Sequence, residues 1–395
     1  MSDATKLRTA LTGTATRREI RQQPDVWRET ARILRGRRGA LDAFLAPLLA
    51  REDLCIVLTG AGTSAFIGQI AAPSLGAQLG RRVEAVATTD LVSHPGGYLP
   101  KDVPTLLVSF ARSGDSPEST AATALADQLL DEVSHLIVTC NPDGALNRAR
   151  ASRPGSFVLL MPERSHDDGF AMTSSFTAML LSVLLAFRGD DEAAVEALAA
   201  AGEQLLAQEE RIAELAASAP HRLVYLGGGP LVGLARESAL KTLELTAGQV
   251  VAYYDSPLGF RHGPKAVLDA KSLAVVYRSA DPYSAAYDED IITELRATIG
   301  SERVLTISAG RSDAPAAADG TYYWELAGLE GLDDAYLAVA YVVFAQLFAL
   351  YCSVALGLTP DNPFPDGDVN RVVKGVIIHP LIGTPVPVRA AEPRR

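Results

Sequence analysis

The segment RESALKTLELTAGQVVAYYDSPLGFRHGP (residues 236–264) brings acidic, basic and imidazole side chains close together in the sequence. Glu237, Lys241 and Glu244 are spaced so that they would share one face of a helix. Such charge pairs are also common on solvated helix surfaces, where they contribute little. His262 is followed by Gly-Pro, which cannot continue a helix, so we expect its imidazole on a rigid turn. A carboxylate on a helix and a histidine on a loop are the components of an acid/base site.

Two further stretches are rich in glycine and hydroxyl groups. GAGTS (residues 60–64) and SGDSPEST (residues 113–120) each follow an apolar run and precede a predicted helix. Main-chain N–H groups at a helix N-terminus, together with Ser and Thr hydroxyls, are how α/β proteins hold phosphate. Helix capping alone explains one or two of these hydroxyls, but not two hydroxyl-rich turns. The candidate phosphate-binding residues are Gly62, Thr63, Ser64, Arg112, Ser113, Gly114 and Ser116, with Ser119 and Thr120 as further hydroxyls.

Two other interpretations of these motifs involve a cofactor or a metal. Residues 60–65 match the GxGxxA pattern of dinucleotide-binding proteins, with Glu84 near the required distance, but a lone match has low specificity. The GxxxxGK[ST] pattern of nucleoside triphosphate sites is absent from the sequence. His166, Asp167 and Asp168 could form a metal site, but no second ligand motif accompanies them. We therefore expect neither a metal nor a cofactor.

The elements that would position these residues occur in two similar series. Apolar strands are expected at 54–59, 105–110 and 135–140, and again at 223–226, 273–277 and 303–308. Strands that alternate with helices predict a parallel, doubly wound sheet. The chain is therefore expected to be a tandem repeat of a three-layer α/β/α, flavodoxin-like domain. Because the second series lacks a hydroxyl-rich second turn, we expect one anion site per chain.

The length of 395 residues is that of two domains. We expect an N-terminal helical extension (1–50), a first domain with a linking helix (51–217), a second domain (218–358) and a C-terminal tail that reaches the site (359–395). The apolar run 335–358 is predicted to be a buried helix, since it is interrupted by polar residues and glycine.

The composition limits which partners the protein is expected to bind and indicates its cellular compartment. The net charge of −11 argues against nucleic-acid or anionic-membrane partners, although a local site can still hold a small anion. Three widely separated cysteines are expected to be buried thiols in a reducing environment. With a polar N-terminus and no apolar signal segment, the sequence predicts a cytoplasmic protein.

Taken together, GAGTSAFIG, SGDSPEST and ESALKTLEL…HGP resemble the SIS (sugar isomerase) domain family. The resemblance covers most of the chain as two SIS domains, and it is similar to the isomerase half of glucosamine-6-phosphate synthase without the glutaminase domain. DGFAMTSSF (residues 168–176) and the tail from PDNP to VNRVVKG (360–375) are similar to the AgaS-type group. These are the galactosamine-6-phosphate deaminase/isomerases, also called tagatose-6-phosphate ketose/aldose isomerases.

The resemblance implies roles by motif position. Ser113 and Ser116, helped by Thr63 and Ser64, would hold the sugar phosphate. Glu244 would be the proton-transferring base with Lys241 beside it. His262 would open the sugar ring, supplied by the neighbouring subunit of a homodimer, and Lys374 would contact the open-chain sugar.

Four positions add to these expectations. Lys374 lies among apolar residues and could simply extend from a strand or helix to solvent. Ala111-Arg112-Ser113 stands where the synthase has Ser-Gln-Ser, and Met172 stands where a serine is expected, so recognition near C2 and C3 of the sugar is expected to differ. Asp168 is expected to orient a loop or a polar group of the substrate.

The implied reaction converts galactosamine 6-phosphate to tagatose 6-phosphate and ammonia by ring opening and proton transfer between C2 and C1. An aldose/ketose phosphate isomerase that releases no nitrogen would use the same residues. A sugar-phosphate-sensing regulator is an alternative from another class, and a dehydrogenase is a more distant one.

Overall fold

The computed structural model describes residues 3–217, 220–310, 322–373 and 375–382. Its strands form two five-stranded parallel sheets, ordered β2-β1-β3-β4-β5 and β10-β9-β8-β6-β7. The first sheet contains β1 (Cys55–Thr59), β2 (Val83–Ala85), β3 (Thr105–Ala111), β4 (Val133–Thr139) and β5 (Ser156–Leu160). The second contains β6 (Arg222–Gly227), β7 (Val251–Asp255), β8 (Leu273–Tyr277), β9 (Val304–Ser308) and β10 (Tyr323–Glu325). Each sheet with its helices is called the first or the second half below.

The two sheets repeat one topology. When the five strands of each half are numbered along the chain, they lie across the sheet in the order second, first, third, fourth, fifth. Every pairing is parallel. Strands β1, β3 and β9 are buried along their whole length, and β6 and β8 are buried from their second residue on, as expected for sheets covered on both faces. The predicted tandem α/β fold is therefore confirmed.

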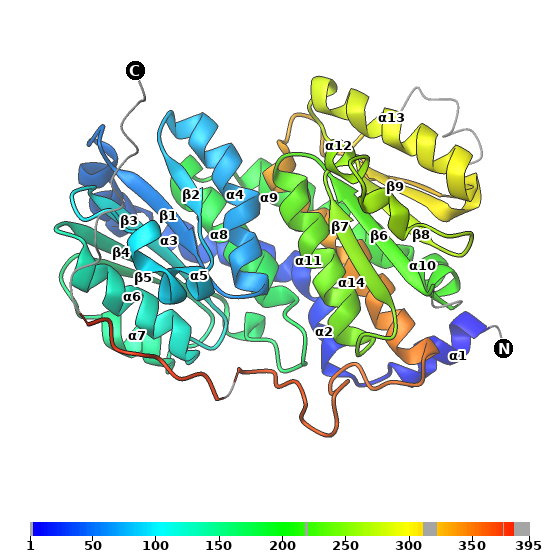
Figure 1. Ribbon diagram of the computed structural model, residues 1–395, viewed down its shortest axis with the longest axis horizontal. Helices are drawn as coiled ribbons and strands as arrows, with labels where there is room; N and C mark the ends of the chain where they lie inside the picture. The colour runs from blue at the N-terminus through cyan, green and yellow to red at the C-terminus, as the bar shows by residue number, and fades with distance from the viewer. Residues whose placement is uncertain (1–2, 218–219, 311–321, 374, 383–395) are drawn as a thin grey trace, which may run out of the picture.

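Helices cover both sheets and join the halves (Figure 1). The helices of the N-terminal part and the first half are α1 (Asp3–Ala10), α2 (Ala15–Arg21), α3 (Gln23–Leu49), α4 (Thr63–Leu79), α5 (Thr88–Ser93), α6 (Pro117–Leu129), α7 (Ala145–Arg150) and α8 (Ser174–Arg188). They are followed by α9 (Glu192–Ala207), α10 (Glu209–Ala216), α11 (Pro230–Leu245), α12 (Pro257–Phe260), α13 (Pro282–Ile299) and α14 (Asp334–Ala355). Short 3₁₀ turns are η1 (Pro95–Gly97), η2 (Glu163–Ser165), η3 (Pro264–Val267) and η4 (Ser301–Arg303).

The N-terminal helices contact both halves. Helix α1 packs against α10 and α14 beside the second sheet, whereas α3 packs against α8 and α9 behind the first sheet (Figure 1). On α3, Trp27 is fully buried, and it faces Gly202 of α9, where a Cβ would come within 2.8 Å of the indole. The predicted boundaries between the N-terminal extension, the two domains and the C-terminal tail stay a prediction, because contacts such as that between Trp27 and Gly202 join one segment to the next.

Helix α14 is the apolar centre of the molecule. By length and composition it could cross a membrane, but 94% of its most apolar stretch is buried inside the protein. It packs against α11, α10 and α9. The expected buried helix is therefore confirmed, and α14 is a core helix of the protein.

The halves meet where α4 packs against α11, the helices that follow β1 and β6. Their closest approach is at Gly233, where a Cβ would lie 2.8 Å from Ile70 Cγ1 and 3.0 Å from the Ile70 main-chain nitrogen. Such a contact leaves no room for a side chain, because the main chain of α4 cannot easily move aside. This close crossing places the N-terminus of α4 beside the later turns of α11.

We predict opposite effects of alanine at two glycines within helices. Gly36→Ala on α3, where nothing lies within 4 Å of an added Cβ, should stabilise the protein by about 0.5–1 kcal/mol through helix propensity. Gly233→Ala should instead destabilise it by about 1–3 kcal/mol, because overpacking against Ile70 outweighs that gain. Urea unfolding of both variants measures the difference, and equal stabilisation would contradict the close crossing.

Candidate active site

The carboxyl ends of β1 and β3 form the topological switch point of the first sheet. These strands are neighbours, with Thr59 in register with Ser109, while β2 and β4 flank them on opposite sides. Open α/β sheets bind ligands at this crevice. After β1, the chain turns so tightly at Gly60 that a Cβ would come within 2.6 Å of the Ser64 main chain. Gly62 has φ +56° at the N-terminus of α4, a conformation that favours glycine.

The turn after β3 is held by hydrogen bonds to its neighbours. Asn141 donates to the Ser113 carbonyl at 2.8 Å, and the Asp115 N–H donates to Ser113 Oγ at 3.3 Å. The Ser116 and Ser119 hydroxyls are 2.6 Å apart. Gly114 has φ +69°, which orients the turn between β3 and α6. Both Ser113 and Ser116 are half-buried at the carboxyl end of the sheet.

Capping does not account for these hydroxyls. Ser116 is the residue before α6, yet its side chain accepts no hydrogen bond from the first turn of that helix. Helix α4 likewise begins without a side-chain cap. Two helix N-termini at one crevice, both without a capping side chain, are suited to hold an anion.

The corresponding turn of the second half is already occupied by an acid of the same chain. The Ser279 hydroxyl and the Ala280 N–H donate to the Asp334 carboxylate at 2.6 Å and 2.8 Å. The Ser279 N–H donates to Asp288 at 2.8 Å. Among the described residues, no carboxylate is seen to accept hydrogen bonds from Ser113 or Ser116 in the equivalent turn of the first half. That turn therefore suits an external anion, and a single anion site per chain stays a prediction.

Lys241 lies between Glu237 and Glu244, the two acids whose spacing predicted that all three would share one helix face. Its ammonium donates to the Thr63 hydroxyl of α4 at 3.1 Å and to the Glu244 carboxylate, and it lies 3.6 Å from Glu237 Oε1. The side chain is fully buried. Burial lowers the pKa of Lys241, but the two carboxylates outweigh it and the pKa lies above its ordinary value. A residue of the second half is thereby tied to the start of α4, at the turn after β1 in the first half.

The two acids beside Lys241 have different surroundings. Glu237 is fully buried, and burial raises its pKa to about 8, against the opposing effect of Lys241. Glu244 keeps 24% of its side chain exposed. The group is therefore no solvated helix surface, and of the two carboxyls Glu244 is the one that a ligand can reach.

Arg112 begins the turn after β3, one of the two candidate phosphate-binding turns, and joins it to two other segments. Its guanidinium donates to the carbonyl of Phe170 at 3.4 Å and to that of Arg371 at 2.8 Å. The residue is only 6% exposed. Burial and the neighbouring Arg371 lower the pKa of Arg112, whereas Asp167 and Glu244 raise it. Arg112 thus lies within electrostatic reach of Glu244.

Asp167 has a role that its sequence context did not reveal. Its carboxylate accepts the N–H groups of Thr173, Ser174 and Ser175 at 2.8–3.0 Å and so caps α8. Asp168 pairs with Arg18 on the surface. Because Asp167 already serves α8, these residues do not present a ready set of ligands. Within the ranges that the structure describes, no three His, Cys, Asp or Glu side chains cluster in a way that could hold a metal ion.

Not every predicted residue reaches this group. His262 lies exposed between α12 and η3, and among the described residues no hydrogen bond or ion pair connects its side chain to Glu244 or Lys241. Lys374 lies outside the described residues. Met172 packs half-buried against the main core. Within one chain, the structure brings together the helix acids, Lys241 and the phosphate turn, but not the histidine.

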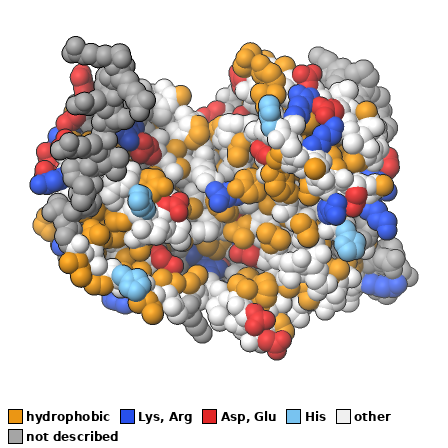
Figure 2. All heavy atoms as spheres, in the orientation of Figure 1, with side chains coloured by type: hydrophobic (Ala, Val, Ile, Leu, Met, Phe, Trp, Pro, Cys, Tyr) orange, Lys and Arg blue, Asp and Glu red, His pale blue; other side chains and the backbone are white. Residues whose placement is uncertain are grey.

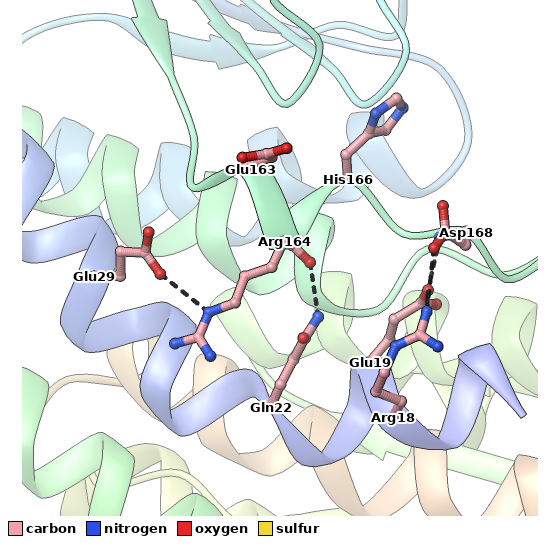
Figure 3. Close-up of a pocket in the computed structure, with 8 residues that line it drawn as sticks. All are labelled: Arg18, Glu19, Gln22, Glu29, Glu163, Arg164, His166 and Asp168. Carbon is pink, nitrogen blue, oxygen red and sulfur yellow. Dashed lines mark hydrogen bonds and ion pairs between the residues drawn. The ribbon is translucent and has the colours of Figure 1, made fainter. Parts of the chain in front are cut away.

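Next to the loop that carries Asp167 and Asp168 lies a polar cavity of about 530 Å³, which the sequence did not predict (Figure 3). It is lined by Arg18, Glu19, Gln22, Glu29, Glu163, Arg164, His166 and Asp168. Buried Glu19 accepts the N–H groups of Asp168 and Gly169, and burial together with Asp167 raises its pKa to about 7. The lining charges are paired, Arg164 with Glu29 and Arg18 with Asp168. These pairs support the loop that carries Asp167.

Comparison with known proteins shows the family of this chain. The SIS domain model matches residues 48–188, which contain the first sheet. The AgaS protein of Streptomyces coelicolor is 58% identical over 368 residues, covering 92% of this chain and 95% of that protein. The chain belongs to the AgaS family. The D-galactosamine-6-phosphate deaminase AgaS of Escherichia coli is 48% identical, covering 94% of this chain and 97% of its own length.

A solved structure extends the AgaS similarity to three dimensions. The crystal structure of tagatose-6-phosphate ketose/aldose isomerase from Escherichia coli matches with a TM-score of 0.87 at 44% identity. The match covers 95% of this chain and 98% of that one. The resemblance drawn from the turn and helix motifs is therefore confirmed at the level of family and fold.

We predict that Glu237 makes stability depend on pH. Since its pKa is raised to about 8 in the folded protein, its protonated form stabilises the native state, fully at pH values below about 4.3 and not above about pH 8. As the pH rises from about 4.3 to about 8, the free energy of unfolding of the wild type should fall relative to that of Glu237→Gln. The fall should be about 1.4 kcal/mol for each unit by which folding raises the pKa of Glu237.

Urea unfolding at several pH values between 5 and 8.5 measures this difference. Glu203→Gln, at an exposed carboxylate paired with Arg28, reports the effect of the same substitution on the surface. Parallel stability curves for wild type and Glu237→Gln would show that Glu237 is ionised throughout.

Proposed function

We propose that this protein converts D-galactosamine 6-phosphate and water to D-tagatose 6-phosphate and ammonia. The observation that carries the proposal is the hydrogen bond from Lys241 to Thr63, which sets Glu244 beside an open, hydroxyl-lined turn. Such an arrangement suits a substrate with a phosphate at one end and an acidic C–H at the other. Family membership and the name of the Escherichia coli relative support the choice of aminosugar.

The phosphate would be bound at the switch point of the first sheet. Ser113, Ser116, Thr63 and Ser64 would donate hydroxyl or main-chain hydrogen bonds, with Gly62 and Gly114 allowing a close approach of the main chain. Buried Arg112 would supply positive charge. Because the phosphate is several bonds from C1 and C2, its binding energy would position the sugar over the base.

Glu244 would carry out the proton transfer. After ring opening, its carboxylate takes the proton from C2 of the amino aldehyde. The C–H electrons form the C1=C2 bond of the enolamine, while the carbonyl electrons move to O1, which takes up a proton. Glu244 then delivers its proton to C1 as the nitrogen loses one proton, which gives a C2 imine, and water hydrolyses this imine to the ketose and ammonia. Lys241 holds the carboxylate in place and balances its charge. Lys374 would contact the open-chain sugar.

His262 would come from the other subunit of a homodimer. Three exposed apolar side chains, Leu243, Val251 and Leu258, lie on α11, β7 and α12, close in sequence to Glu244 and His262. Figure 2 shows hydrophobic side chains gathered over α11 and β7 on one face of the molecule. A second copy placed on this face would cover it and bring in the imidazole that one chain does not supply.

We place the enzyme in the cytoplasm with other phosphosugar metabolism. Its buried free cysteines suit a reducing compartment.

A non-deaminating aldose/ketose isomerase is the second candidate. It is favoured by the 44% identity to the tagatose-6-phosphate ketose/aldose isomerase structure. The same Glu244 would serve both reactions, since both begin with removal of the C2 proton.

The deciding experiment incubates the purified protein separately with galactosamine 6-phosphate, glucosamine 6-phosphate and tagatose 6-phosphate. Ammonia and ketose phosphate are followed together. Equal release of both from galactosamine 6-phosphate is the expected result. Formation of an aldose phosphate from tagatose 6-phosphate without any ammonia release from the aminosugars would favour the second candidate.

Glu244→Gln should abolish most turnover. We expect kcat to fall by about 10²–10⁴-fold, the usual contribution of a positioned base, while KM changes little because the phosphate turn is intact. Glu203→Gln is the control, since it removes a carboxylate that lies on the surface. Near-normal kcat for Glu244→Gln would remove this residue from the proposed role.

Mixed dimers test whether the site is shared. If His262 acts across the interface, Glu244→Gln and His262→Ala homodimers are both inactive, but each mixed dimer regains one intact site. Random subunit exchange should then restore about a quarter of wild-type activity. Exchange verified by native mass spectrometry without recovery of activity would mean that both residues act within one chain.

A further inference from the structure

The described C-terminal residues 359–373 and 375–382, called the strap below, follow the second half but lie along the first. Figure 1 shows it leaving α14 and running past α2 toward α6 and α7. At its start, the Asp361 carboxylate accepts the N–H groups of Ala15 and Thr16 at 2.8 Å, which caps α2. Near its end, Gln128 of α6 donates to the Leu381 carbonyl at 3.4 Å. The strap is thus attached at both ends.

Between these ends, the strap crosses the loop that carries Asp167. The Phe364 ring packs against Phe170, with ring centroids 5.3 Å apart. The Arg371 guanidinium donates to the main-chain carbonyl of Asp167. In return, Arg112 donates to the Arg371 carbonyl at 2.8 Å and to the Phe170 carbonyl at 3.4 Å. Arg371 therefore connects the strap to two segments: its guanidinium donates to the loop that carries Asp167, and its carbonyl accepts from Arg112 at the turn after β3.

These hydrogen bonds bring two guanidinium groups together beside the phosphate turn. Arg112 is buried, and the positive charge of Arg371 disfavours its charged form further. The carboxylates of Asp167 and Glu244 act on Arg112 electrostatically, but Asp167 accepts the N–H groups of α8 and Glu244 is paired with Lys241. Among the described residues, the hydrogen bonds of both guanidinium groups go to main-chain carbonyls, and neither group forms an ion pair with a carboxylate. An anion bound at the turn after β3 would therefore find positive charge beside it.

We propose that Arg371 is a positioning residue that fastens the strap across the phosphate turn, and that an anion at this turn tightens the fastening. This inference rests on the proposed function for its catalytic consequence, but the fastening itself does not need turnover. Arg371 touches no reacting atom in this scheme. It acts by holding Arg112 and the Asp167 loop in place around the bound sugar phosphate.

The test compares Arg371→Ala with Arg371→Lys, because a lysine ammonium can still donate to the Asp167 carbonyl. Arg371 is exposed, so the variants should fold. Arg303→Ala is the matched control, since Arg303 is a surface arginine on η4 paired with Glu302. We expect Arg371→Ala to lower kcat/KM by about 10–100-fold, the usual effect of slight misplacement of a substrate. Lysine should restore most of it.

Amide hydrogen exchange of residues 359–373, with and without inorganic phosphate, tests the fastening without turnover. Phosphate should slow exchange in wild type and Arg371→Lys, but not in Arg371→Ala. Wild-type kinetics and exchange in Arg371→Ala would overturn the proposal, as would a loss of activity that lysine does not rescue. If the wild type shows no turnover, the proposed function fails, and the phosphate-dependent exchange still decides whether Arg371 fastens the strap.

Discussion

The buried ammonium of Lys241 is the constraint on which the rest of the site depends. Removing a lysine charge from water is unfavourable by several kcal/mol, and it is tolerated only where partners are complete and well placed. Here the partners come from both halves, Glu237 and Glu244 on α11 and Thr63 on α4. The close crossing at Gly233 brings these helices within reach. The partners that the buried ammonium requires thus also fix how far the Glu244 carboxylate lies from Thr63 and the turn after β1.

Much of the fold was predictable because it depends on local patterns. Apolar runs followed by turns rich in glycine, serine or proline indicated the β1, β3, β6 and β8 strands in order, and the spacing of Lys241 and Glu244 indicated a shared helix face. Parallel pairing then required the turns after β1 and β3 to meet at one edge. These inferences need only periodicity and the topology of α/β sheets.

The contacts that complete the site follow from no local pattern. Arg112 bonds to carbonyls 58 and 259 residues away, and Glu19 holds amides 149 and 150 residues later. A main-chain carbonyl has no sequence signature, since every residue has one. The capping role of Asp167 was hidden for a related reason: its neighbours His166 and Asp168 suggested a ligand cluster, whereas its partners are the N–H groups of α8. Partners of this kind become visible only once the chain is folded.

The carboxylate of Asp334 at the second turn has a consequence for duplicated proteins of this type. A group attached to its own binding turn is present at an effective concentration that no dissolved metabolite matches. Asp334 therefore keeps Ser279 and Ala280 engaged, however much phosphosugar accumulates. Under the proposed function, the second half then contributes α11 with Glu244 and Lys241, while the turns of the first half would bind the phosphate. The two repeats would thus serve different parts of one substrate.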